Sequence, residues 1–215
     1  NNGPVGAYPG VSVDGARAAR ATAPLRSRKG IVARRLGAPG PAPAELASIV
    51  NAAAHAPDHG QLLPWRFVLV PDAARPLLAE VFAQALLERD PGATPEQCGQ
   101  AREKAFRAPV LMLVVVDGER GDPEIDLAER LLSAGCAVQN MLLMATAQGY
   151  GSALTSGKAL KAASLRALFR LSACERALCF ISIGTVLSRK AARARPVPSD
   201  YVSTLDADRG VVPGF

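Results

Sequence analysis

Metal-ligating and redox-active residues are scarce in this sequence. The 215 residues include two histidines and four cysteines, and the cysteines form no C-x-x-C pair with the spacing of a zinc or redox site. A chain of this length buries a sizeable core without disulfide bridges. We therefore expect no metal, and we expect the cysteines to act as small apolar residues in a reducing cytosol. They are Cys98, Cys136, Cys174 and Cys179.

Long apolar runs and a secretory signal are also missing. The most apolar helix candidate, residues 131–149, contains Ser133, Gln139, Asn140 and Gln148, which is typical of a buried core helix rather than a membrane span. The first residues lack the basic and apolar regions of a secretory signal. These features predict a cytoplasmic protein that has no membrane partner.

Aromatic residues make up only 5% of the chain, which argues against nucleic acid as a partner. The formal net charge of +6 permits an anionic partner such as nucleic acid, a membrane surface or a phosphorylated cofactor, although arginines on an ordinary surface give the same charge. Basic stretches occur at 26–35 and 189–195, but they lack the interleaved aromatic residues that stack on bases. A basic nucleic-acid-binding module is therefore the weaker alternative.

The sequence predicts one folded domain preceded by an arm. Residues 1–24 are rich in Gly, Ala, Pro and Arg without a sustained period, so we expect a flexible N-terminal arm and a single domain over residues 25–215. Hydrophobic periodicity predicts helices near residues 43–56, 77–86, 95–106, 122–148 and 164–171. Apolar runs predict strands at 68–70, 110–116 and 178–186, with an irregular tail from Arg189 onward.

Local signals support several of these elements. Pro43 suits a first helical turn, and Pro57 disfavours helix in the residue before it. Thr94 and Gln97 have the spacing of a capping box. The seven consecutive apolar residues Val110–Val116 are typical of a strand that is buried on both faces. Helices outnumber dispersed strands, which predicts an α+β layer fold.

A family resemblance rests first on residues 55–67, which read HAPDHGQLLPWRF. This segment resembles the flavin-binding helix-loop-strand of the nitroreductase family, in particular its compact members. Four further segments agree in order: the turn at 28–30, the small-residue run 133–137 within the long helix, the loop at 149–157 and the strand end at 183–190. The resemblance implies a central, mainly antiparallel sheet flanked by helices, in an intertwined homodimer with two FMN sites at its interface.

The resemblance also assigns contacts to the FMN phosphate. The turn Arg28-Lys29-Gly30 matches the family's basic turn after its first helix, where the side chains hold the phosphate, and a guanidinium offers two parallel donors to such a group. Arg189, with Lys190 as the alternative, matches a second basic contact after the last core strand. A solvated basic turn is the plain structural alternative for either segment.

Other flavin contacts follow from the same resemblance. His55 and His59 match residues that contact the flavin across the dimer interface; for His55, a cation in the last turn of a helix is an equally good explanation. Asp58 and Gly60 are expected to shape the loop, and Trp65 to pack in the core. A second set of residues is expected at the edge of the flavin ring: Leu154, Thr155 and Ser156.

The implied activity is that of an FMN-dependent oxidoreductase in which the flavin, rather than a catalytic side chain, carries the hydride. NADH or NADPH would reduce the flavin, and a nitroaromatic, quinone or other flat small molecule would then accept the electrons in a ping-pong cycle. Arg34 or Arg35 could stabilise negative charge on the reduced ring. The alternative within the family is specialised flavin chemistry, either reductive dehalogenation or flavin breakdown.

Overall fold

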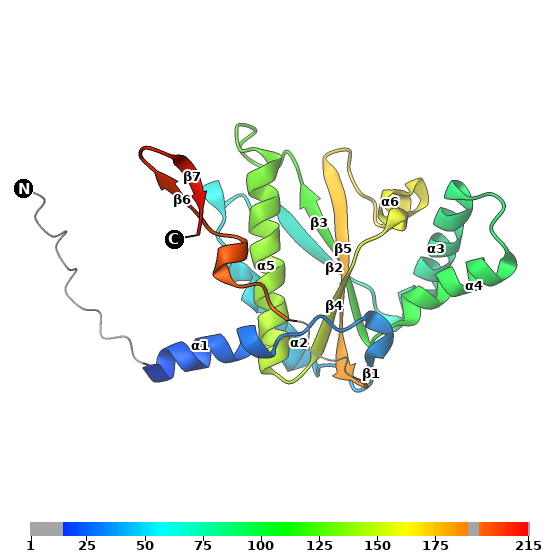
Figure 1. Ribbon diagram of the computed structural model, residues 1–215. Helices are drawn as coiled ribbons and strands as arrows, with labels where there is room; N and C mark the ends of the chain where they lie inside the picture. Colours follow the sequence, from blue (N-terminus) through cyan, green and yellow to red (C-terminus); the bar gives the residue numbers. More distant parts are fainter. Residues whose placement is uncertain (1–14, 189–193, 215) are drawn as a thin grey trace, which may run out of the picture.

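The computed structural model describes residues 15–188 and 194–214, and Figure 1 shows a central sheet with helices on both sides. The helices are α1 (Gly15–Ser27), α2 (Pro43–Asn51), α3 (Arg75–Arg89), α4 (Pro95–Glu103), α5 (Leu127–Ala147) and α6 (Ala163–Leu168). The strands are β1 (Leu36–Gly37), β2 (Trp65–Leu69), β3 (Val110–Asp117), β4 (Gly151–Thr155), β5 (Glu175–Val186), β6 (Ser203–Asp206) and β7 (Gly210–Pro213).

The main sheet is organised around its two longest strands, β3 and β5. These two strands pair antiparallel, with a register shift between Val114 and Val115. Strand β2 pairs antiparallel with β3, and strands β1 and β4 pair antiparallel with β5. The α+β class and the central antiparallel sheet are therefore confirmed.

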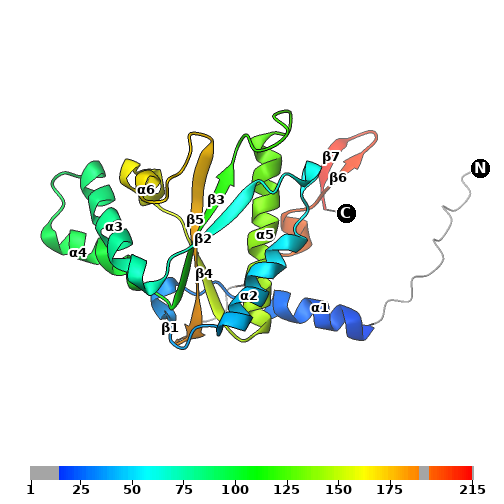
Figure 2. The same ribbon diagram turned by 180° about the vertical axis from the view of Figure 1, so that it is seen from behind.

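Strand β3 shows why the sheet needs helices on both faces. Its residues Val110–Val116 are each no more than 8% exposed, as the apolar run predicted. Alternate side chains of a strand point to opposite faces: Met112 and Val114 join the core formed with α2 and α5, whereas Leu111 and Leu113 join the core formed with α3 and α6. Figure 2 shows these two helical layers from the opposite side.

The predicted helix starts are confirmed at α2 and α4. Pro43 is the first residue of α2, and the Ala42 N–H donates to the Glu45 carboxylate at 2.7 Å. At α4 the Gln97 N–H donates to the Thr94 hydroxyl at 3.2 Å, and the Thr94 N–H donates to the Gln97 side chain at 2.8 Å. Each pair satisfies backbone donors that a helix N-terminus leaves open.

The long helix α5 begins later than the sequence pattern predicted, at Leu127 rather than near Asp122. The reason is Arg130, which is only 1% exposed. Its guanidinium donates to the carbonyls of Arg120, Asp122 and Ile125 at 2.6, 2.6 and 3.0 Å. These bonds hold the preceding segment as a loop. Among the described helices, none is both long and apolar enough to cross a bilayer.

The N-terminal expectation needs a correction, because α1 occupies Gly15–Ser27 where an irregular arm was predicted up to residue 24. The helix contains many small residues and Pro24 in its interior, so it lacks the apolar period on which sequence prediction depends. The Arg28 N–H donates to the Pro24 carbonyl at 2.9 Å and extends the last turn. Helix α1 contacts α5 near the C-terminal end of that helix (Figure 1).

The prediction of an irregular tail is wrong for residues 203–213, which form the antiparallel hairpin β6–β7. The Asp206 carboxylate accepts the N–H groups of Asp208 and Arg209 at 3.0 and 2.9 Å. Gly210 has a φ of 71°, a conformation that glycine adopts without a steric penalty. The hairpin turn therefore follows from ordinary Asx-turn chemistry.

Candidate functional site

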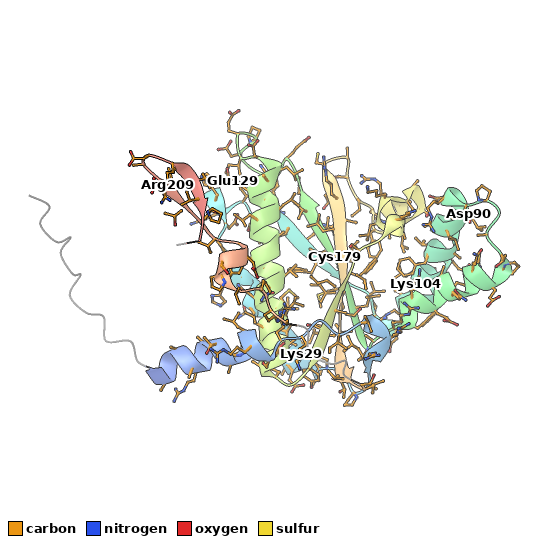
Figure 3. The ribbon with its side chains drawn as sticks, viewed as in Figure 1. Lys29, Asp90, Lys104, Glu129, Cys179 and Arg209 are labelled. Carbon is orange, nitrogen blue, oxygen red and sulfur yellow. The ribbon has the colours of Figure 1, made fainter. Side chains whose placement is uncertain are left out.

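An open cavity of about 780 Å³ lies where β4 meets the chain segment between α1 and β1. We call it the cation groove. Figure 3 shows Lys29, one of its residues, beside the C-terminal end of α5. Among the described residues, its lining contains six basic side chains and no carboxylate: Arg26, Lys29, Arg34, Arg35, Arg107 and Arg195.

The backbone between α1 and β1 is fixed against β4, and this fixes which side chains enter the groove. The Ile31 N–H donates to the Ser152 carbonyl at 3.1 Å. Ile31 and Ala33 are each 8% exposed, so this part of the segment is anchored by alternate apolar residues. Lys29 and Arg34 are exposed and line the groove. The alternation therefore presents cations to the open side.

Within residues 15–188 and 194–214, no cation of the groove forms an ion pair with a carboxylate. In the part of the chain that the structure describes, the ion pairs involve His59, Arg66, Arg102 and Arg209, none of which lines the groove. One groove cation, Arg195, donates to the Arg28 carbonyl at 2.9 Å. Several cations that share one concave surface attract an anion with several acceptor oxygens.

The structure brings four of the predicted FMN contacts together in this groove: Lys29, Gly30, Leu154 and Thr155. Leu154 and Thr155 belong to β4, which corrects the expectation that residues 149–157 form a loop. A Cβ at Gly30 would meet nothing within 4 Å, so this glycine leaves open space beside Lys29. Arg28 does not line the groove, and its carbonyl accepts a hydrogen bond from the groove residue Arg195.

The second predicted phosphate contact, Arg189 or its alternative Lys190, lies outside the described residues. Ser188 and Arg195 flank that segment in the chain, and both line the cation groove. Arg195 was noted in the sequence only as part of a basic stretch. Its contribution depends on the return of the chain to Arg28, which no local pattern predicts.

Ser156 borders a second cavity, of about 720 Å³, between β4 and the helices α3 and α4. The second cavity and the cation groove share Ala33, Arg107 and Thr155 in their linings. The predicted ring-edge residues therefore stand where two cavities adjoin. Sequence reasoning missed Arg107, because nothing at 104–109 marks a position that faces β4.

His59 lies at the opposite end of α5 from the cation groove, and His55 is exposed at the end of the 3-10 turn Ala52–His55 that follows α2. His59 Nδ1 is 2.6 Å from a carboxylate oxygen of Glu129 in the first turn of α5, whereas Lys29 and Gly149 line one small cavity at the C-terminal end. The helix between Glu129 and Ala147 is roughly 27 Å long at 1.5 Å per residue. Figure 3 labels Glu129 and Lys29 at these two ends, so His59 and the cation groove of one chain lie far apart.

The loop that carries His59 has a defined, partly strained backbone. Gly60, Gln61 and Leu63 have φ values of 70°, 52° and 47°, a region that non-glycine residues rarely adopt. The Asp58 carboxylate accepts the Leu63 N–H at 2.7 Å. Asp58 and Gly60 thus shape the loop as predicted, and they hold His59 in an exposed position.

Trp65 and the cysteines Cys174 and Cys179 lie in surroundings that fit structural roles. Trp65 is 9% exposed and its indole N–H donates to the Ser133 hydroxyl at 3.0 Å, which confirms its core role. Burial raises the pKa of the Cys179 thiol to about 11. The pKa of Cys174 is raised by its hydrogen bond to the Glu119 carboxylate. Neither thiol has the depressed pKa of a nucleophile at neutral pH.

Comparisons with known proteins agree with this architecture. The family model described as "Nitroreductase family" matches residues 25–185. A Haemophilus influenzae protein named "Putative NAD(P)H nitroreductase" is 32% identical over 173 residues, which cover 80% of this chain and 93% of that protein.

Two solved structures are similar in fold. The nitroreductase-like family protein from Bacillus cereus has a TM-score of 0.74 at 17% identity, covering 87% of this chain and 96% of the other. A variant of the FMN- and NADPH-dependent nitroreductase NfnB from Sphigopyxis sp. strain HMH has a TM-score of 0.66 at 19% identity, covering 85% and 97%.

Proposed function

The chain belongs to the nitroreductase family and is an oxidoreductase; we propose that it uses FMN to transfer electrons from NADH or NADPH to flat small-molecule acceptors such as nitroaromatics and quinones. The observation that carries this proposal is the cation groove. It gathers Lys29, Gly30, Leu154 and Thr155, which the family resemblance assigns to FMN, on one concave surface with five more cations.

The charge of the groove supports binding of the phosphate end of FMN. A phosphate group needs several donors, and its charge favours a site that has cations and no carboxylates. Lys29, Arg107 and Arg195 supply such donors from three separate parts of the chain. The Arg28 carbonyl accepts a hydrogen bond from Arg195, but Arg28 does not line the groove. We therefore assign the direct phosphate contact to Lys29, which does.

The ring of FMN would extend along β4. Leu154 is 50% exposed and offers an apolar wall, while Thr155 and Ser156 are also exposed and offer hydroxyl donors. When bound, FMN supplies the redox chemistry, because its ring accepts and donates a hydride. The chain binds and orients the ring. Arg34 and Arg35, which both line the groove, would stabilise negative charge on the reduced ring.

We further propose that the working unit is a homodimer with shared sites. A site that contains both the cation groove and His59 must take them from different chains, because the two lie at opposite ends of α5. The exposed side of α5 supports this arrangement: Leu131 and Leu132 are 37% and 69% exposed, and a Cβ at Gly135 would meet nothing within 4 Å. A second copy packed here would cover this apolar stripe.

Purification without added flavin tests the proposed function. We expect a yellow protein that binds one FMN per chain, oxidises NADH or NADPH, and reduces a quinone or nitroaromatic with the parallel double-reciprocal lines of ping-pong kinetics. A colourless protein that does not quench the fluorescence of added FMN would contradict the proposal. Release of halide from a halogenated aromatic, without reduction of nitro or quinone acceptors, would favour the specialised dehalogenation alternative.

A further inference from the structure

The second cavity has an aromatic floor. Phe82 of α3 and Phe180 of β5 pack edge to face with ring centroids 5.6 Å apart, and both line the cavity together with Leu86 and Leu160. Phe180 is only 4% exposed, whereas Phe82 is partly exposed to the cavity. An apolar floor with rings that are already fixed favours a flat aromatic molecule over a flexible polar one.

The rim of the second cavity is positively charged. Its described lining contains the cations Arg89, Lys104, Arg107 and Lys158 and one carboxylate, that of Glu103. None of these five takes part in an ion pair within the part of the chain that the structure describes. A flat molecule on the aromatic floor would therefore gain charge-assisted contacts if it carried an anionic group.

The backbone of the turn that carries Arg107 is fixed at the junction of the two cavities. The buried guanidinium of Arg75 donates to the carbonyls of Ala105 and Pro109 at 2.6 and 3.1 Å, so it ties together both ends of the turn that carries Arg107. Within this turn Ala108 has a φ of 82°, a strained value for a residue with a Cβ. The turn therefore keeps the base of the Arg107 side chain at this junction, and its guanidinium offers a planar set of donors to an anion.

We propose that the second cavity is the acceptor site and that it selects aromatic acceptors with an anionic substituent, such as a carboxylate or sulfonate. This inference rests on the proposed FMN function, because Thr155 and Ser156, the proposed ring-edge residues, line the second cavity. An acceptor there lies beside the flavin. Its ring contacts Phe82, and its anionic group contacts Lys104 and Lys158.

NADPH is the alternative occupant of the second cavity. It differs from NADH by a phosphate on its adenosine, and the cations of the rim could bind this additional anionic group. The position of the cavity favours the acceptor, since Thr155 and Arg107 place it directly against the cation groove. The two sources predict different changes in kinetics, which one set of variants separates.

The test uses the FMN-loaded full chain and two acceptors of similar size, 4-nitrobenzoate and the neutral 4-nitrobenzyl alcohol. The double variant Lys104→Gln/Lys158→Gln removes two rim charges. We expect the ratio of kcat/KM for the carboxylate over the alcohol to fall about tenfold or more relative to wild type, since a charge-assisted contact is worth at least that factor. Comparison with wild type cancels the intrinsic difference in reducibility between the two acceptors.

Lys161→Gln is the matched control. Lys161 lies on the same short 3-10 turn as Lys158, is exposed and does not line the cavity, so its acceptor ratio should equal that of wild type. An unchanged ratio of kcat/KM for the carboxylate over the alcohol in the double variant overturns the inference. The inference is also overturned if the double variant loses its preference for NADPH over NADH while the acceptor ratio stays the same. If the wild-type protein fails to bind FMN, or reduces neither acceptor, the proposed function itself is contradicted.

Discussion

Basic side chains have different surroundings in two regions of this molecule. In the interior, Arg75 and Arg130 are 3% and 1% exposed, and each donates to three backbone carbonyls. In the cation groove, Arg34 and Lys29 are exposed and form no ion pair among the described residues. Each nitrogen of the two buried guanidinium groups donates to a carbonyl of the fold, whereas Lys29 and Arg34 are open to a ligand.

The two groups of cations differ in whether the fold itself supplies their hydrogen-bond partners. A guanidinium has five N–H donors, and a buried one is tolerated only where carbonyls or carboxylates accept them. Burial lowers the pKa of Arg75, which is the cost that its three carbonyls offset. The groove cations bear no such cost, since water solvates them until an anion arrives. Stability should therefore depend on Arg75, and ligand affinity on Lys29.

Arg75→Ala should give the largest change. The substitution leaves two buried carbonyls and one partly buried carbonyl without their donor. Each unsatisfied buried group costs about 1–3 kcal/mol, so we expect a loss of about 3 kcal/mol in the free energy of unfolding. Urea unfolding at fixed protein concentration measures it. The matched control is Arg102→Ala, which removes an exposed ion pair with Glu80 and should have a much smaller effect. Equal losses in the two variants would break the comparison.

Gly135→Leu tests whether the exposed stripe of α5 is an interface. A leucine fits the free chain, because nothing lies within 4 Å of the new Cβ, but it would prevent close packing of a second copy at a cost of about 1–3 kcal/mol. We expect a monomer by sedimentation, with weaker FMN binding. If the variant stays dimeric with wild-type flavin affinity, the interface lies elsewhere.

His59→Ala should have an intermediate effect on flavin binding. A stacked or hydrogen-bonded ring is worth roughly 1–2 kcal/mol, so the dissociation constant for FMN should rise about five- to thirtyfold while the fold stays intact. Fluorescence titration measures this change. Glu129→Gln, which keeps the shape of the residue 2.6 Å from His59, should give a smaller rise. Wild-type affinity and wild-type NAD(P)H oxidation in His59→Ala would show that His59 is an ordinary solvent-facing loop residue.

Arg66 illustrates a third environment, pairing with a carboxylate. It donates to both oxygens of Glu175 at 2.6 and 3.1 Å, and this hydrogen bonding holds the pKa of Glu175 below its ordinary value. A lowered carboxyl pKa adds stability above the unfolded pKa, and that stability is lost as pH falls through the folded pKa.

Arg66→Ala should therefore reduce stability by about 1 kcal/mol or less at pH 7 and should have less effect once Glu175 is protonated. Arg75→Ala, which involves carbonyls only, should cost the same at both pH values. Urea unfolding of both variants at pH 7 and in acid checks this difference. A constant cost for Arg66→Ala across that range would contradict the pairing.

Elements with strong local signals were predictable from the sequence. Strand β3 follows from the unbroken run Val110–Val116, and the start of α4 follows from Thr94 and Gln97. Helix α1 was missed because small residues and Pro24 give no apolar period. The start of α5 was misplaced because Arg130 reaches back to three carbonyls, a contact that no periodicity reveals.

The residues of the candidate site also differ in how far the sequence predicted them. Lys29 and Thr155 were found by resemblance, because each lies in a recognisable short segment. Arg107 and Arg195 also line the cation groove but were not predicted to do so, since their place depends on which distant strand or turn they meet. Local sequence specifies an element, but a shared surface depends on the packing of segments that are far apart in the chain.

Paired titrations with FMN and riboflavin test the central claim most directly. Riboflavin lacks the phosphate, so Lys29→Ala should weaken FMN binding by about 1.5–3 kcal/mol and leave riboflavin binding nearly unchanged. Lys161→Ala, an exposed lysine away from the groove, should affect neither ligand. A selective loss of FMN affinity is the result that the cation groove predicts. Equal losses for both flavins, or no loss for either, would show that Lys29 does not hold the phosphate.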